Sequence, residues 1–314
     1  MDTHHAILGI FLFCLTVTYL STRFLRRPRV RTVKAWGWAG LGIILLAEVL
    51  LALRAPGVTT FFTPIVWTGY VLLVDGLVGS LRGRSRLAEA PGGFLALAFW
   101  SVPLWLVFEA YNLRLANWAY VGLPQNLRVR SLGYVWSFAT IWPAIFETAD
   151  FLEALDFFHE PRARLRLSAS TRLTLSALWL AAVAVPVLIP VRLGQYLFGP
   201  VWVGFVLLLD PWNGRWGGTS LLADLEQGRT RRLFSTLAAG GVCGILWEFW
   251  NYWAGARWVY VFPIFQGWKI FEMPAPGFLG FPPFALECLV MYEFLRVVRQ
   301  RLPGVEMRAA ESRL

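Results

Sequence analysis

Two stretches of the chain repeat one another, Trp67-Thr-Gly-Tyr-Val-Leu-Leu-Val-Asp75 and Trp202-Val-Gly-Phe-Val-Leu-Leu-Leu-Asp210. Both are mostly apolar up to a final aspartate, and they lie 135 residues apart. Three more pairs of motifs follow in the same order, at offsets of 139 or 140 residues. They are Phe108-Glu-Ala-Tyr-Asn112 with Trp247-Glu-Phe-Trp-Asn251, Trp118-Ala-Tyr120 with Trp258-Val-Tyr260, and Pro143-Ala-Ile-Phe-Glu147 with Pro283-Phe-Ala-Leu-Glu287. Motifs that recur in order at a nearly constant offset indicate two tandem copies of one structural unit.

The composition predicts an all-α polytopic membrane protein. Hydrophobic residues make up 57% of the 314 residues and charged residues 15%, against about 25% charged in a typical soluble domain. The apolar residues form runs of about 20, the length of a helix that crosses a bilayer, and they do not alternate as barrel strands do. We expect about nine spans, at 5–22, 36–54, 60–78, 94–113, 132–154, 173–191, 196–212, 233–253 and 277–298.

The basic residues predict the orientation of these spans. With the N-terminus outside, 22 of the 29 Lys and Arg residues fall in the inside loops and the C-terminal tail. This distribution follows the positive-inside rule for a bacterial inner (cytoplasmic) membrane with a cytoplasmic C-terminus. The predicted parts are an N-terminal anchor helix and basic loop (1–34), repeat unit 1 (35–157), a basic linker (158–172), repeat unit 2 (173–300) and a flexible tail (301–314). Four spans per unit is an even number, so the two units should be parallel.

Charge and cysteine usage exclude several classes of protein. The net charge of +10 comes from short loops between apolar runs, where Arg and Lys set topology and contact anionic lipids, so we expect membrane lipids and no nucleic acid as partners. The three cysteines, Cys14, Cys243 and Cys288, form no CxxC motif, and the three histidines form no cluster. Neither a metal site nor a cofactor is therefore predicted.

Four intramembrane glutamates are the candidate catalytic residues: Glu109, Glu147, Glu248 and Glu287. An ionisable side chain in a membrane helix costs about 2.5–3.5 kcal/mol on insertion scales, so it usually faces a cavity or a partner. In an apolar pocket a carboxyl group can stay protonated and act as an acid. Asn112 and Asn251 follow one helical turn after a glutamate and could orient it. The alternative is that the glutamates only hydrogen-bond neighbouring helices and hold the bundle together.

Two other groups of acidic residues are predicted to be structural. Asp75 and Asp210 end their spans near the cytoplasm, where an aspartate usually caps a helix or pairs with arginine. Asp150 has no acidic counterpart in the second unit, where Val290 stands in its place.

Aromatic residues surround these glutamates. The chain has 17 Trp and 24 Phe, and interfacial belts account for only part of them. Aromatic faces stabilise cations, so an acid beside aromatic walls suits carbocation chemistry on an apolar substrate. The candidate substrate-binding residues are Trp247, Trp250, Asn251, Asn112, Trp258, Tyr260, Trp118 and Tyr120. The stretch from Phe271 to Pro283 is rich in Pro and Gly, and it predicts an irregular or re-entrant approach to the last span.

At these motifs the chain, from about residue 60 to 298, resembles the membrane lycopene cyclase domain family, which is often a tandem pair of small helical domains. In that family an acidic residue follows an aromatic, an aromatic loop comes next, and a Pro-x-Glu-type motif starts the following helix. The matching elements are Trp247-Glu248, Trp258-x-Tyr260 and Pro283-x-x-x-Glu287, with Phe108-Glu109, Trp118-x-Tyr120 and Pro143-x-x-x-Glu147 in the first unit. Here a single Glu, displaced by two positions, replaces the family's acidic pair. The Trp-Glu motif is also similar to small membrane terpene cyclases.

Both resemblances imply a proton-initiated, cofactor-free cyclisation of an isoprenoid, as in carotenoid biosynthesis. On this hypothesis Glu248 or Glu109 protonates a double bond, the aromatic residues stabilise the cation, and Glu287 or Glu147 accepts the last proton. The more aromatic second unit is the preferred active one. Two alternatives stay open: a lipid or polyprenyl-carrier transporter with proton-coupled glutamates, and a membrane assembly protein without chemistry. The sequence does not determine the oligomeric state.

Overall fold

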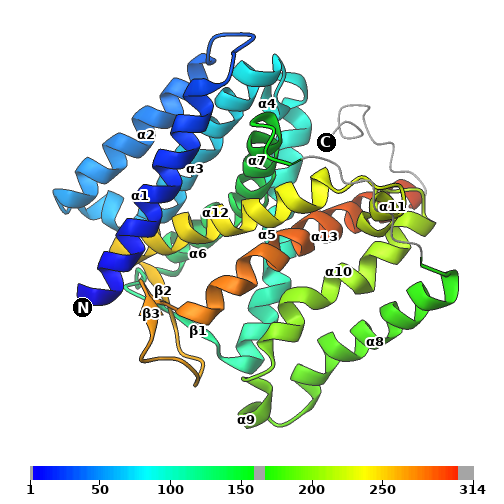
Figure 1. Ribbon diagram of the computed structural model, residues 1–314. Helices are drawn as coiled ribbons and strands as arrows, with labels where there is room; N and C mark the ends of the chain where they lie inside the picture. The colour runs from blue at the N-terminus through cyan, green and yellow to red at the C-terminus, as the bar shows by residue number, and fades with distance from the viewer. Residues whose placement is uncertain (1–2, 159–166, 303–314) are drawn as a thin grey trace.

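The computed structural model describes residues 3–158 and 167–302, and the chain there is almost entirely helical (Figure 1). The predicted linker at 158–172 and tail at 301–314 fall mostly outside these residues. The long helices are α1 (Thr3–Arg26), α2 (Ala35–Ala52), α3 (Pro56–Arg82), α5 (Pro91–Leu115), α6 (Leu127–Ala139), α7 (Ile141–Ala154), α8 (Ala169–Leu188), α10 (Phe198–Arg215), α12 (Arg231–Trp253) and α13 (Phe281–Arg301). The short ones are α4 (Arg86–Glu89), α9 (Val191–Gly194), α11 (Leu221–Glu226) and the 3-10 helix η1 (Ala275–Gly280).

In the described part of the chain, seven helices are long and apolar enough to cross a membrane: α1, α2, α3, α5, α8, α12 and α13 with η1. Such a set is typical of a multi-pass membrane protein. The other two expected spans, 132–154 and 196–212, fall on α6 with α7 and on α10. The first of these is divided at Thr140, where the hydroxyl bonds back to the carbonyl of Ser137. Pro143 lacks an N–H group, so it is tolerated only in the first turn of the new helix.

Glycines let the first helix of each half pack closely against the next one. On α3, a Cβ at Gly69 would lie 2.8 Å from the carbonyl oxygen of Gly40 on α2, so no larger residue fits there. The corresponding residue of the second half, Gly204 on α10, is equally crowded by the side chain of Val183 on α8. The pairs α2–α3 and α8–α10 therefore have the same kind of contact.

The predicted helix-capping role of Asp75 and Asp210 is confirmed. The side chain of Asp75 accepts hydrogen bonds from the Ser85 hydroxyl and the Leu87 amide at the start of α4, over 2.9 Å each. Asp210 accepts from the Ser220 hydroxyl at 2.7 Å and from the amides that open α11. The two repeated motifs that opened the sequence thus end in the same local structure.

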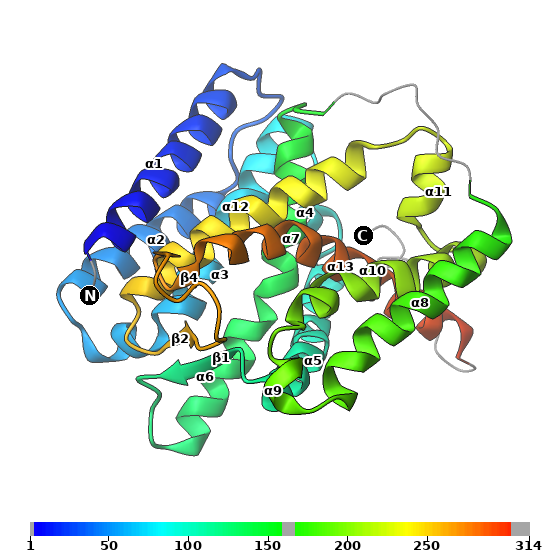
Figure 2. The same cartoon turned by 60° about the horizontal axis from the view of Figure 1, so that its bottom comes forward.

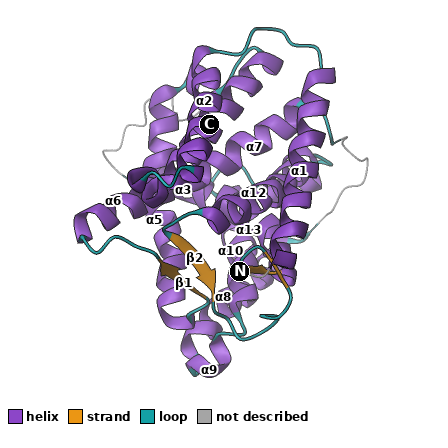
Figure 3. Ribbon diagram, turned by 90° about the vertical axis from the view of Figure 1, so that its left-hand side faces the viewer, coloured by secondary structure: helices purple, strands orange, loops and turns teal. Residues whose placement is uncertain are grey.

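A two-stranded antiparallel ribbon joins the halves at the opposite end, near the N-terminus (Figures 1 and 3). It consists of β1 (Trp118–Val121) and β2 (Arg257–Tyr260), and Figure 2 shows it beside α6. Trp118 pairs with Tyr260, and Tyr120 pairs with Trp258. Since these are the two Trp-x-Tyr motifs, each motif pairs with the reversed copy of itself, as across a local two-fold axis.

The approach to α13 is irregular, as the Pro/Gly-rich stretch predicts. A second small ribbon of β3 (Lys269–Ile270) and β4 (Met273–Pro274) leads through η1 into α13. The first half has the regular helix α6 in the corresponding place. The N-terminal helix α1 covers this region, because the Phe271 amide bonds to the His5 carbonyl and Phe13 stacks on Phe249 of α12 at 3.6 Å between ring centroids.

Candidate functional site

Glu109 lies near the end of α5, where one oxygen of its carboxyl group receives three donors. The hydroxyl of Tyr120 donates to Oε1 over 2.5 Å, Nε1 of Trp105 over 2.8 Å and Nε1 of Trp118 over 3.3 Å. Trp105 is one turn earlier on the same helix, while the other two come from β1. The strand therefore folds back onto the helix through its aromatic side chains.

Glu248 on α12 has a similar environment with fewer donors. It is fully buried, and its Oε1 accepts from the Tyr260 hydroxyl over 2.8 Å and from Nε1 of Trp258 over 3.4 Å. Its Oε2 is buried without a hydrogen bond of normal geometry. Gly244 stands where the first half has Trp105, and the ring of Phe281 fills the space beside it. The two glutamates thus have matching tyrosines but different numbers of donors.

The two asparagines order the strands and make no hydrogen bond to the glutamates. Nδ2 of Asn112 donates to the Trp118 carbonyl over 2.9 Å, and its Oδ1 accepts from the Trp118 amide over 3.0 Å. Asn251 makes the same pair of bonds with Trp258, at 2.8 and 3.0 Å. A side-chain amide offers both a donor and an acceptor, so one residue can satisfy both backbone groups. The asparagines act on the glutamates only through the strands that they fix.

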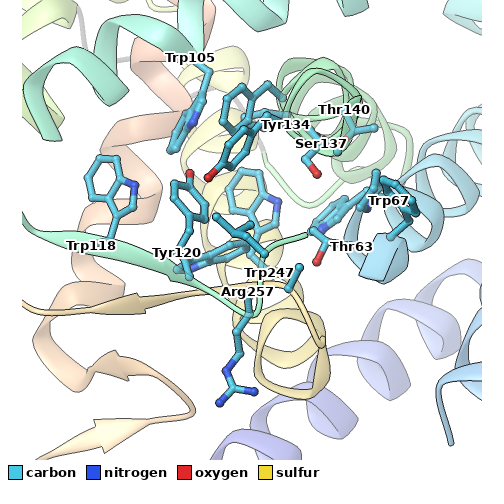
Figure 4. Close-up of a pocket in the computed structure, with 18 of the residues that line it drawn as sticks. Thr63, Trp67, Trp105, Trp118, Tyr120, Tyr134, Ser137, Thr140, Trp247 and Arg257 are labelled. Atoms are coloured by element: carbon cyan, nitrogen blue, oxygen red, sulfur yellow. Dashed lines mark hydrogen bonds between the residues drawn. The ribbon is translucent and has the colours of Figure 1, made fainter. Parts of the chain in front are cut away.

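Between the two halves lies a cavity of about 130 Å³ (Figure 4). Its wall is mainly aromatic and is formed by residues of α3, α5, β1, α6, α10, β2, α12 and α13. The aromatic lining residues are Phe61, Trp67, Trp105, Trp118, Tyr120, Tyr134, Phe138, Trp202, Trp247, Trp258, Tyr260, Phe281 and Phe284. Five of the predicted binding residues, Trp118, Tyr120, Trp247, Trp258 and Tyr260, are among them.

The polar lining is sparse and carries no acid among the described residues. Four hydroxyl side chains (Thr60, Thr63, Ser137 and Thr140) and two arginines (Arg130 and Arg257) line the cavity. Tyr120 and Tyr260 each touch both the cavity and a carboxyl group. Burial, reinforced by the neighbouring carboxylate, raises the pKa of both phenols well above its usual value. They stay protonated at neutral pH and can donate a hydrogen bond or relay a proton.

The other two predicted acids lie elsewhere. Glu147 is fully buried on α7, and its nearest cation is Arg86, with Nε 3.9 Å from its Oε1. Arg86 bonds more closely to Asp150, at 2.8 Å. Glu287 on α13 is also buried, and its Oε1 accepts from the Phe205 amide over 3.0 Å. The fold therefore brings Glu109 and Glu248 to one aromatic cavity and keeps Glu147 and Glu287 apart from it.

Some residues of the site carried no motif. Glu48 of α2 accepts a 2.9 Å hydrogen bond from Nε1 of Trp250, a predicted binding residue that does not itself line the cavity. Trp250 instead packs edge-on against Trp67, with centroids 5.0 Å apart, and so supports the cavity wall. The repeats contained a clue to Trp67, since it opens the first motif, but the sequence holds no clue to Glu48.

Neither a metal nor a known relative assigns a chemistry to this cavity. In the described part of the chain, no group of three or more His, Cys, Asp or Glu side chains is placed to hold a metal ion. No family model matches the chain, and neither a curated protein nor a solved structure is similar to it at a significant level.

Proposed function

We propose that this protein binds an apolar isoprenoid in the aromatic cavity and cyclises it by protonation, without a cofactor. The observation that carries the proposal is the pair of matching carboxyl–tyrosine contacts on one aromatic cavity. A cation within about 6 Å of an aromatic face is stabilised by it, and the cavity offers such faces on every side. A wall with few polar groups also keeps water from capturing the cation.

The reaction would conserve the atoms of the substrate. A proton adds to one carbon of a double bond, the electron pair of a second double bond closes the ring, and loss of a proton from a neighbouring carbon restores neutrality. The product is an isomer of the substrate, so no oxidant or reductant is needed.

The two carboxyl groups divide the acid and base roles on this proposal. Glu248, with one oxygen free of hydrogen bonds, suits the acid, and Tyr260 can relay its proton to the cavity. Glu109 receives three donors on one oxygen, an environment that suits the charged carboxylate and hence the base. The base role proposed for Glu147 or Glu287 has less support, because neither contacts the cavity.

The same proposal includes the membrane arrangement. A chain of nine spans, with an anchor helix and two parallel four-helix repeats, is supported by the matching contacts of Asp75 with Asp210 and of Gly69 with Gly204. With the N-terminus outside the inner membrane, the β1–β2 ribbon faces outward, and the cavity opens toward the outer half of the bilayer.

The test is incubation of the purified protein with linear isoprenoids such as lycopene, followed by a search for products of unchanged mass. Glu248→Gln should lower the rate at least about 100-fold, the usual contribution of a general acid. Glu89→Gln, at an exposed position on α4, is the matched control. Full activity in both Glu248→Gln and Glu109→Gln would rule out the proposed acid.

Binding without chemistry is a second candidate function, favoured by the absence of a carboxyl group from the described wall of the cavity. A lipid or polyprenyl-carrier transporter would use the same cavity and couple it to protons. Uptake of a polyprenyl lipid into proteoliposomes, driven by a proton gradient and without an isomeric product, would favour this function. A defect in protein stability alone would leave the assembly role.

A further inference from the structure

The geometry points to an anionic head group on the ligand of this cavity, held by Arg130 at its mouth while the isoprenoid tail lies among the aromatic rings. This inference rests on the proposed binding of an isoprenoid and names its substrate class: a prenyl chain that ends in a phosphate-type anion.

Arg130 is a cation without a partner on an otherwise apolar wall. It lines the cavity, is partly exposed, and makes no ion pair within residues 3–158 and 167–302. The second arginine of the wall, Arg257, is 3.7 Å from a carboxylate oxygen of Glu272, and Figure 4 shows its guanidinium group pointing away from the labelled rings. Arg130 is therefore the unneutralised charge, and guanidinium groups bind phosphates with paired hydrogen bonds.

The local structure also favours an anion here. Arg130 belongs to the first turn of α6, where the helix dipole is unfavourable for a cation and where no acidic residue compensates it. An anion at this place would be attracted by both the arginine and the helix N-terminus. The same face of α6 continues inward with Gly133, Tyr134 and Ser137, all of which line the cavity.

A chain of contacts leads from Arg130 to the proposed chemistry. Tyr134, one turn further along α6, packs edge-on against Tyr120, with centroids 5.1 Å apart. Tyr120 in turn donates to Glu109. A ligand with its head at Arg130 would thus place its tail beside the tyrosines and carboxyl groups, and the head group would fix which double bond lies there.

The experiment compares two probes that differ only in the head group, geranylgeranyl monophosphate and geranylgeraniol. Binding to the full-length protein is measured by calorimetry in a non-ionic detergent without phospholipid. The monophosphate should bind roughly tenfold more tightly than the alcohol, as one charge-assisted contact provides. Arg130→Gln should abolish that preference, and Arg130→Lys should keep part of it. Arg128→Gln is the matched control, because Arg128 lies in the same first turn but is exposed and does not line the cavity.

The outcomes separate this inference from the proposed function. Equal affinity for alcohol and monophosphate would overturn the head-group inference but leave the isoprenoid cavity standing. If neither probe binds, both fail. Displacement of the monophosphate by an equal concentration of phosphatidylglycerol would show that Arg130 serves a phospholipid head group, and displacement by inorganic phosphate would show that the tail contributes nothing. Either displacement would overturn the inference.

Discussion

Trp118 and Tyr260 are cross-strand partners in the β1–β2 ribbon, although 142 residues of sequence separate their positions. Trp118 donates to Glu109 and Tyr260 donates to Glu248. The residues that hold one glutamate are therefore paired with those that hold the other. A change at one carboxyl site should be felt at the second through the ribbon.

A double-mutant cycle measures this coupling. We expect Trp118→Ala and Tyr260→Ala to destabilise the protein by less together than the sum of the two changes, with a coupling of about 0.2–1 kcal/mol, the size of a cross-strand pair. The measurement is thermal unfolding in detergent. The control cycle combines Trp118→Ala with Trp216→Ala, since Trp216 packs on Phe294 and Arg301 at the end of α10. Equal coupling in the two cycles would contradict the proposed communication through the ribbon.

The asparagines should matter for stability because each one satisfies two backbone groups of a strand. Asn251→Ala leaves the amide and the carbonyl of Trp258 without their side-chain partners. The loss should be about 1–3 kcal/mol, the cost of leaving a buried polar group unsatisfied, and it lowers the midpoint of thermal unfolding. Gln300→Ala, at an exposed position of α13, provides the comparison. An unchanged midpoint for Asn251→Ala would mean that water replaces the side chain at no cost.

The glycine contact between α2 and α3 allows a matched pair of substitutions on one helix. A Cβ at Gly40 would meet the backbone of α3 at Gly69 and Leu73, whereas a Cβ at Gly42 would meet nothing within 4 Å. Gly40→Ala should destabilise the protein by about 1–3 kcal/mol, because backbone atoms cannot move aside as a side chain can. Gly42→Ala should be neutral or stabilising, since alanine is the better helix former. Similar unfolding midpoints for the two variants would contradict close packing of α2 on α3.

Short-range features of the site could be predicted from sequence, and long-range ones could not. Tyr120 follows Glu109 by only 11 residues, so the motif itself indicated that a helix end and a loop would meet. Asp75 likewise reaches Ser85, ten residues away. No motif indicated the bond between Glu48 and Trp250, which are 202 residues apart, because it depends on how α2 packs against the second half.

The number of helices and the place of the acids show the same limit. An apolar run from 132 to 154 reads as one span, but the chain divides it at Thr140, because Pro143 is compatible with a new first turn. This break gives α6 its own direction and lets its inner face line the cavity. Glu147, in contrast, follows α7 toward Arg86, so equal spacing in the two repeats did not make the four glutamates meet.

The phenols that hold the two glutamates make the protein sensitive to alkaline pH. Because burial raises the pKa of Tyr120 and Tyr260, they stay protonated in the folded chain at a pH where the unfolded chain ionises them, above about 10. The folded state then binds more protons than the unfolded one, so stability falls as the pH rises through that range, while below it the two phenols have no effect. Ultraviolet titration of tyrosinate checks this. In the native state, Tyr120→Phe with Tyr260→Phe should titrate with the same amplitude as the parent, and in denaturant it should lose two of nine tyrosines. A loss of amplitude already in the native state would mean that the phenols are open to water and do not shield the carboxyl groups from it.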